Sequence, residues 1–366
     1  MSFQVSIQSS QHNFQVEADE TLLEAALRQG LTLPYGCRDG ACGACRGKVL
    51  SGRIDHGKAQ IHALSVPDRA AGFALFCCAK AQSDLVVECK EARSLKDFPV
   101  KTMPARVQTL TLAAPDVMIL ELKLPASERL QFLAGQYIDI LLKDGKRRAF
   151  SLANAPHDDA SLQLHIRQTP GGQFTGHVFG AMKERDILRF NGPHGTFFLR
   201  EDSKKPILMI AGGTGFAPIK AMIEHAIAEK SDRPITLYWG GRASVDLYHA
   251  ALAEQWASTH PHIRFVPVLS EPDAVWGGRR GLVHEVAMQD FPDLSAHQVY
   301  VCGAPGMVVA ARRDLVSRCQ LPEDQFFADS FDFACDSGNQ PGNQPGNESG
   351  NQPGNNSATD VAQHAQ

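Results

Sequence analysis

The sequence lacks the features that would place the protein in a membrane, outside the cell or on a nucleic acid. No uninterrupted apolar run approaches the roughly 18 residues that a membrane-spanning helix needs, so we expect no membrane span. The opening MSFQVSIQSSQHNFQV has neither the basic start nor the apolar core of a signal peptide, which predicts a cytoplasmic location. A net charge of −4 provides no basic footprint, so nucleic acid is not an expected partner.

The conditions for a disulfide framework are also missing. The chain has nine cysteines, but the count is odd, there is no export signal, and 366 residues are enough for two or three domains with cores of their own. Metal or redox chemistry is therefore the better explanation for the cysteines.

Changes of pattern along the chain predict three folded domains and a tail. Residues 1–92 alternate short strands with one helix over 21–29, as in a small α+β unit. Residues 100–202 hold β-rich segments punctuated by Gly and Asn, which indicates a compact β-barrel or sandwich. Residues 203–333 alternate strands with helices, including helices at 218–228 and near 247–255, which predicts a doubly wound parallel sheet. Residues 334–366 repeat GNQP and cannot bury apolar area, which predicts a disordered tail.

Three cysteines stand close together in PYGCRDGACGACRGKV, residues 34–49. Cys37, Cys42 and Cys45 have the C-x4-C-x2-C spacing of a plant-type [2Fe–2S] site, and small residues around them let the backbone wrap a cluster. A structural zinc site needs a second short hook, and a thioredoxin-like pair would explain only two of the three cysteines. Spacing leaves both Cys77 and Cys78 open as the fourth ligand.

Residues 148–154, RAFSLAN, combine an Arg fork for a phosphate, an aromatic face and a Ser hydroxyl. A second segment, HIRQTPGGQFT at 165–175, places two glycines before a helix whose free N–H groups suit a pyrophosphate. Each segment alone also fits an ordinary strand or turn. Together they favour a flavin site.

Glycines follow the apolar strand PILMI in AGGTGFAPIKAM, from residue 211, and open a helix as a dinucleotide site requires. After the next strand stand Arg242 and Asp246, where an adenosine ribose would lie. An acid there favours NADH and an Arg accommodates the 2′-phosphate of NADPH, so both dinucleotides stay open. A third segment, YVCGAPGMV at 300–308, offers Cys302 at a strand end.

These motifs together resemble the ferredoxin reductase superfamily, in its electron-transfer reductases with an N-terminal plant-type ferredoxin domain. The resemblance covers roughly residues 1–333 and implies a β-grasp ferredoxin domain, an FAD-binding β-barrel and a nicotinamide-binding α/β domain. A ferredoxin-like segment around Asp84 selects Cys77 as the fourth ligand. The resemblance also implies that Ser151 and Cys302 are catalytic, near the flavin N5 and the nicotinamide C4, and it favours NADH. The implied cofactor-binding residues are Arg148, Ala149, Phe150, Ser151, His165, Ile166, Arg167, Gly171, Gly172, Phe174, Thr175, Gly212, Gly213, Thr214, Gly215, Arg242, Asp246, Cys302, Gly303 and Pro305.

The three modules predict one electron path. NADH gives two electrons together and a [2Fe–2S] cluster takes one at a time, so FAD must stand between them. The partners that the resemblance implies are NAD(P)H and a protein electron acceptor, which is an iron–sulfur dehydrase or an oxygenase component. Two other classes compete with this prediction: a stand-alone flavin or quinone reductase, and a redox-sensing protein that oxidises NADH negligibly.

Overall fold

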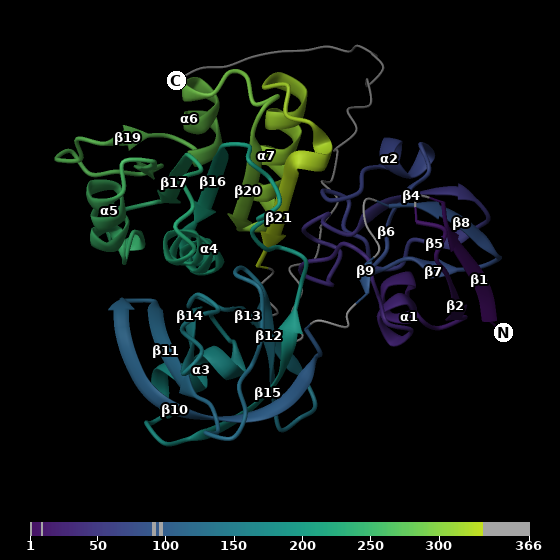
Figure 1. Ribbon diagram of the computed structural model, residues 1–366, viewed down its shortest axis with the longest axis horizontal. Helices are drawn as coiled ribbons and strands as arrows, with labels where there is room; N and C mark the ends of the chain where they lie inside the picture. The colour runs from purple at the N-terminus through teal and green to yellow at the C-terminus, as the bar shows by residue number, and fades with distance from the viewer. Residues whose placement is uncertain (1, 9, 90–92, 95–97, 332–366) are drawn as a thin grey trace, which may run out of the picture.

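The computed structural model describes residues 2–8, 10–89, 93–94 and 98–331. Within them the chain forms three domains, with the third above the second and the first beside both (Figure 1). The predicted tail, 334–366, lies outside the described residues, as do 90–92 at the end of the predicted first domain. Among the described residues, no helix is long and apolar enough to cross a membrane.

The first domain is a five-stranded mixed sheet in the order β2-β1-β8-β4-β6 with one helix packed on it. Thr21 caps that helix through the Glu24 backbone N–H, and Glu24 reaches back to Thr21, which fixes the helix start close to the predicted position. The elements are β1 (Ser2–Ile7), β2 (Asn13–Glu17), α1 (Leu22–Arg28), β3 (Leu31–Thr32), β4 (Arg46–Ser51), β5 (Ile54–Asp55), α2 (Val66–Ala70), β6 (Phe73–Leu75), β7 (Lys80–Ala81), β8 (Leu85–Glu88) and β9 (Arg93–Ser94).

The second domain is an antiparallel six-stranded sheet in the order β13-β12-β15-β10-β11-β14. A bridge between Leu152 and Leu164 joins its two edges, so the sheet curls into a barrel round an apolar core. The elements are β10 (Lys101–Ala114), β11 (Val117–Lys123), β12 (Tyr137–Leu141), β13 (Arg147–Ser151), β14 (Ser161–Arg167), α3 (Gln173–Gly180) and β15 (Ile187–His194).

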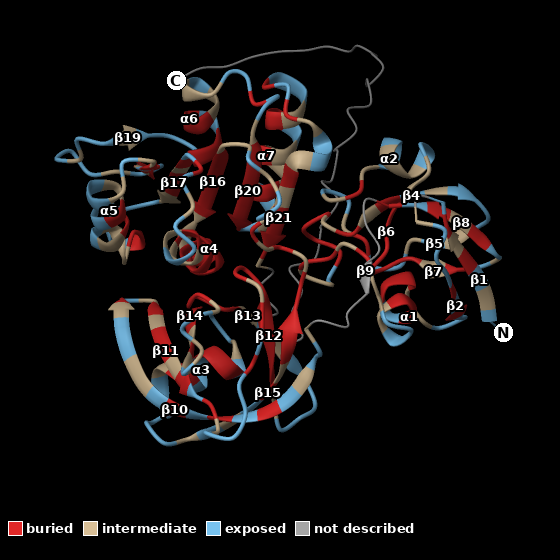
Figure 2. Ribbon diagram, viewed as in Figure 1, coloured by how far each residue is buried: buried red, intermediate tan, exposed pale blue. Residues whose placement is uncertain are grey.

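The third domain is a parallel six-stranded sheet in the order β19-β18-β17-β16-β20-β21, with helices on both faces. Its central strands are mostly apolar and buried, as Figure 2 shows for β16 and β20. The elements are β16 (Ile207–Gly212), η2 (Gly213–Gly215), α4 (Phe216–Ala228), β17 (Ile235–Gly241), η3 (Ser244–Asp246), α5 (Ala250–Thr259), β18 (Ile263–Leu269), β19 (Arg279–Arg280), α6 (Val283–Asp290), β20 (Gln298–Gly303), α7 (Pro305–Arg318), η4 (Glu323–Gln325) and β21 (Phe326–Ser330).

One helix is displaced from its expected position. The sequence predicts a helix near 247–255, but α5 begins at Ala250 and runs to Thr259. The reason is the 3₁₀ turn Ser244–Asp246, which ends at Leu247. The helix follows this turn, with His249 as its N-cap and Ala250 as its first residue.

Candidate functional site

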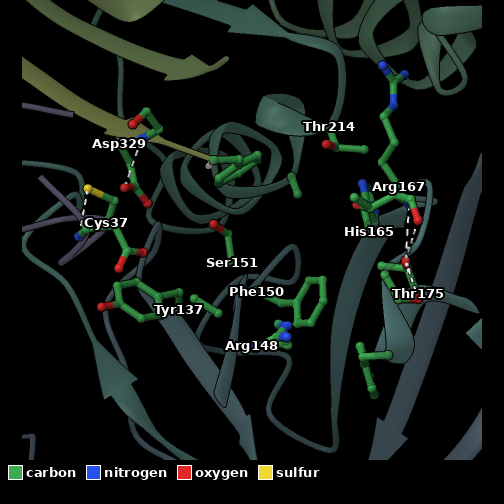
Figure 3. Close-up of a pocket in the computed structure, with 18 of the residues that line it drawn as sticks. Cys37, Tyr137, Arg148, Phe150, Ser151, His165, Arg167, Thr175, Thr214 and Asp329 are labelled. Atoms are coloured by element: carbon green, nitrogen blue, oxygen red, sulfur yellow. Dashed lines mark hydrogen bonds between the residues drawn. The ribbon is translucent and has the colours of Figure 1, made fainter. Parts of the chain in front are cut away.

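A cavity lies where the three domains meet, and we call it the central cavity (Figure 3). The first domain contributes Cys37 and Asp39 from the loop that carries its cysteines, residues 36–46, which we call the cysteine loop. The second domain contributes the end of β13 and the start of α3, and the third contributes the start of α4 and the end of β21. The other lining residues are Tyr137, Arg147, Arg148, Ala149, Phe150, Ser151, His165, Arg167, Thr169, Gly172, Phe174, Thr175, Thr214, Ala217, Asp329, Ser330 and Phe331.

Strand β13 presents the predicted flavin segment to this cavity. The rings of Phe150 and Phe174 both line the cavity, with their centroids 5.3 Å apart and their planes at 46°. The Ser151 hydroxyl is buried and has no hydrogen-bond partner within the described part of the chain. A buried hydroxyl without a partner is costly unless a ligand supplies one, so Ser151 fits a polar ring edge in the cavity.

The start of α3 supplies backbone donors to the same cavity. Gly172 is the N-cap, and no side chain caps the helix there. Thr175 instead accepts from the backbone N–H of Thr169 at 3.1 Å, which folds the preceding turn against the helix. The free N–H groups of such a first turn suit a pyrophosphate.

The four predicted thiols come together as two pairs in the first domain. The interaction of Cys37 with the neighbouring Cys42, together with backbone N–H donors, lowers the pKa of Cys37 to about 6. The Sγ atoms of Cys45 and Cys77 lie 3.1 Å apart. Within residues 2–331, where described, no group of three or more His, Cys, Asp or Glu side chains is arranged to hold one metal ion. Two pairs of thiols suit a two-iron cluster, since each iron then takes two of them.

Backbone N–H groups of the cysteine loop already point at sulfur. Asp39 N–H donates to Cys37 Sγ and Ala44 N–H to Cys42 Sγ, each at 3.4 Å. Such donors stabilise the more negative, reduced form of a thiolate cluster. Gly40 has φ +76°, and a Cβ there would lie 2.8 Å from Cys78 Sγ, so this turn requires glycine.

A second cavity, the glycine cavity, opens at the carboxyl ends of the parallel strands. Gly212, Gly213 and Thr214 form one wall, and Trp239 fixes this turn because its indole N–H donates to the Gly213 carbonyl at 3.0 Å. Trp239 also stacks on Phe216 at 3.9 Å. The remaining lining residues are Arg167, Gly240, Gly241, Arg242, Asp246, Ser270, Gly281, Leu282, Val283, His284, Gly303, Ala304, Gly306, Met307, Ala310 and Phe331.

Asp246 lies in the glycine cavity, but its carboxylate is already engaged. One oxygen accepts from the backbone N–H groups of Arg242 and Ala243 at 2.8 and 3.1 Å, and the other pairs with Arg167 at 3.3 Å. Asp246 therefore holds the turn after β17 and joins the third domain to the second. A ribose contact, as the sequence predicts, would have to share these oxygens.

Five of the predicted FAD- and dinucleotide-binding residues line neither cavity. Ile166 belongs to the barrel core, and Gly171 has φ +73° in the turn before α3. Gly215 is the last residue of the GGTG turn, residues 212–215, and packs against the backbone of Cys302. Cys302 is fully buried in the core of the third domain, and burial raises its thiol pKa well above the ordinary value. Pro305 begins α7. Their direct roles stay predictions.

The central cavity also contains residues that sequence reasoning missed. Tyr137 reaches it from β12 and Asp329 from β21 (Figure 3). Ser330, the next residue of β21, lines it as well. Burial, followed by the nearby Cys37 thiolate, raises the pKa of Asp329 to about 8. These residues carry no motif of their own, because they meet the cavity only through the packing of domains.

His165 lines the central cavity as the sequence predicts, and it also joins two domains. Its Nδ1 lies 2.9 Å from the Tyr248 hydroxyl of the third domain. Complete burial lowers the pKa of His165 well below 6.5, so the imidazole is neutral at physiological pH.

A thiol site, a flavin-type barrel site and a dinucleotide-type glycine turn, packed round one cavity, define a flavoprotein reductase with a fused ferredoxin domain. Three family models match in the same order: a 2Fe-2S iron-sulfur cluster binding domain over 5–82, an oxidoreductase FAD-binding domain over 104–199 and an oxidoreductase NAD-binding domain over 209–313. These matches confirm the predicted fold class and its cofactors, FAD, NAD and a [2Fe–2S] cluster.

Relatives match along most of their length. The CDP-6-deoxy-L-threo-D-glycero-4-hexulose-3-dehydrase reductase of Yersinia pseudotuberculosis is 40% identical over 331 residues, which are 90% of this chain and 99% of the relative. The phenol 2-monooxygenase reductase component DmpP of Pseudomonas sp. is 35% identical over 348 residues, 93% and 97% of the two chains. The solved Amycolatopsis cytochrome P450 reductase GcoB has a TM-score of 0.72 at 35% identity and covers 90% and 98%. The chain belongs to this family of iron–sulfur flavoprotein reductases.

Proposed function

We propose that this reductase carries electrons from NADH through FAD and the [2Fe–2S] cluster to a separate protein acceptor. The observation that carries the proposal is the central cavity, because the cysteine loop, the predicted flavin segment and the third domain all line it. When bound, FAD accepts electrons in pairs and passes them on singly, which reconciles NADH with a cluster.

Each domain contributes a defined part of this path. We propose that Arg148 and the start of α3 bind phosphate groups and that Phe150 and the Ser151 hydroxyl orient a flavin ring, which their position in the central cavity supports. The GGTG turn, held by Trp239, is shaped to bind a dinucleotide beside it. We also propose that the first domain ends at residue 92, that the second spans residues 100–202 and that the third begins at residue 203.

For the acceptor we propose an iron–sulfur dehydrase, so that the activity is that of a CDP-6-deoxy-Δ3,4-glucoseen reductase (CDP-4-dehydro-6-deoxyglucose reductase). The 40% identity to the Yersinia dehydrase reductase, over nearly all of that chain, supports this choice. The second candidate is the reductase component of an oxygenase, which the relative from phenol 2-monooxygenase and the terephthalate 1,2-dioxygenase reductase of Comamonas sp. favour.

The first test is an anaerobic titration of the full chain with NADH, followed by visible absorption. We expect flavin bands and a cluster envelope that bleach in stages. Flavin bleaching without any cluster absorbance, in protein supplied with iron and sulfide, would favour a stand-alone flavin or quinone reductase. Purified dehydrase and oxygenase components, added separately with NADH in excess, then distinguish the two acceptors by the rate of NADH oxidation.

The adjacent cysteines give a matched pair of variants. Because Cys77 Sγ lies 3.1 Å from Cys45 Sγ, whereas Cys78 packs against the Gly40 turn, Cys77→Ser should lose the cluster and Cys78→Ala should keep it. Iron and acid-labile sulfide per chain are the measurement. If the Cys78→Ala protein contained no iron while the Cys77→Ser protein kept its full iron content, Cys78 would be the fourth ligand instead of Cys77.

Removal of the Ser151 hydroxyl tests the flavin side of the proposal. We expect Ser151→Ala to bind FAD but to slow flavin reduction by NADH on the order of 100-fold, the usual effect of removing one aligned donor. Ser258→Ala is the control, since that exposed hydroxyl donates to Gln255 O within α5 and lies outside both cavities. Equal flavin reduction rates in the two variants, measured by anaerobic rapid mixing, would remove Ser151 from the site.

A further inference from the structure

The cysteine loop and the residue before it, Tyr35, are attached to the second domain by an interface more extensive than a flexible tether would give. Tyr35 and Thr196 exchange three hydrogen bonds: Tyr35 N–H donates to Thr196 Oγ1 at 2.8 Å, Thr196 N–H donates to Tyr35 O at 2.9 Å, and the Thr196 hydroxyl donates to Tyr35 O at 2.8 Å. Tyr137, a barrel residue, is buried inside the apolar core of the first domain. The two domains therefore share part of one core.

Arg38 makes the charged part of this interface. It follows Cys37 directly, has φ +61°, and its guanidinium contacts the second domain. Its Nε donates to the Tyr137 hydroxyl and its Nη2 to Asp139 Oδ2, both at 2.8 Å. The Arg38 side chain is 28% exposed and that of Asp139 only 6%. Charge-assisted hydrogen bonds with this little solvent are among the stronger ones in proteins.

Tyr137 connects the charged contact to the loop backbone. Its hydroxyl accepts from Arg38 and donates to the carbonyl of Gly36 at 3.1 Å, and its ring lines the central cavity (Figure 3). One side chain thus touches the cavity and the residue before the first cysteine ligand.

We infer that Arg38, Tyr137 and Asp139 form an anchor that holds the [2Fe–2S] loop at a fixed position against the flavin cavity. The three are positioning residues for electron transfer within the chain, and the inference rests on the proposed path from flavin to cluster. It goes beyond that path because it assigns the coupling of the two centres to a particular interdomain contact.

The charges around Asp139 show why the anchor depends on Arg38. Arg147 lies 3.9 Å from the Asp139 carboxylate but is 57% exposed, and His194, at 3.5 Å, is neutral because burial lowers its pKa to about 3. Arg38 is therefore the cation that lies closest to this buried carboxylate and is the better shielded from solvent of the two arginines. Without it Asp139 would draw in water and open the interface.

The test compares flavin bleaching with cluster bleaching after anaerobic rapid mixing with NADH. Arg38→Gln removes the charge, and Tyr137→Phe removes only the hydroxyl while its ring stays in the core. In Arg38→Gln we expect flavin reduction at the parental rate and cluster reduction slowed about tenfold, because a weakened contact lowers the docked population and misplaced centres react slowly. In Tyr137→Phe, whose ring lines the central cavity, we expect cluster reduction to slow about tenfold relative to flavin reduction in the same protein. Lys58→Gln is the control, since Lys58 pairs with Asp39 of the same loop at 3.1 Å without leaving its own domain.

Several results separate the possible failures. A parent protein whose cluster never bleaches with NADH would contradict the proposed path itself. A parent that relays normally, with Tyr137→Phe and Arg38→Gln equal to Lys58→Gln, would overturn the anchor alone. The spectrum of the dithionite-reduced cluster shows whether each variant retains its cluster. If Arg38→Gln loses the cluster, the rate of cluster reduction in Tyr137→Phe tests the anchor instead.

Discussion

Cys42→Ser is expected to abolish delivery of electrons to a one-electron protein acceptor such as cytochrome c while leaving flavin reduction by NADH intact. Cys42 is one of the four thiols that form the two pairs, and its neighbour Ala44 donates to its sulfur. Without that thiolate the cluster should not be retained, so the rate with cytochrome c should fall on the order of 100-fold or more. The measurement is NADH-dependent cytochrome c reduction, beside ferricyanide reduction as a readout of the flavin.

The control for this variant is Cys319→Ala, at the end of α7 and far from the cysteine loop in sequence. It should keep both activities. If Cys42→Ser passed electrons to cytochrome c at the parental rate, the cluster would not be the exit for electrons, and the path from flavin to cluster would be wrong.

Gly215→Ala is expected to cause the second large loss, at the nicotinamide end of the path. A Cβ at Gly215 would collide with the backbone carbonyl of Cys302 and lie 2.8 Å from the Gly303 nitrogen. The carboxyl end of β20, which holds Cys302 and Gly303, cannot move freely, because β20 is hydrogen-bonded to β16 on one side and to β21 on the other. The GGTG turn must shift, and we expect NADH-dependent flavin reduction to slow on the order of 100-fold, as for other small displacements of a bound reactant.

Gly180→Ala provides the matched comparison, since a Cβ at that position, the end of α3, meets nothing within 4 Å. It should reduce flavin at the parental rate. Dithionite should still reduce the flavin and the cluster of Gly215→Ala, which shows that the cofactors are in place. Parental NADH kinetics in Gly215→Ala would mean that the close packing beneath the turn has no role in dinucleotide binding.

Local chemistry explains why much of this molecule could be predicted from its sequence. The spacing of Cys37, Cys42 and Cys45 is a property of one short loop, and the GGTG turn lies between a strand and a helix that each carry their own pattern. Such local patterns can be recognised without knowledge of the rest of the chain. The three domains and their cofactors follow from them.

The contacts between domains could not be predicted in this way. Arg38 and Asp139 are 101 residues apart, and nothing in either segment specifies the other. The position of Asp329 beside the cysteine loop could not be predicted either. Its Oδ1 packs so closely on Gly36 that a Cβ there would lie 2.6 Å away. Asp246 illustrates a different limit, since an acid after a strand predicts a ribose contact equally well whether or not its oxygens hold a turn.

The bond from Trp239 to the GGTG turn gives the protein an optical probe of its own. All three tryptophans, Trp239, Trp256 and Trp276, belong to the third domain, and Trp239 alone donates to that turn. Ultraviolet emission therefore reports on the third domain, whereas visible absorption reports on the cofactors of the other two. Binding of a dinucleotide and release of the cluster can then be followed at separate wavelengths in a single sample, without an attached label.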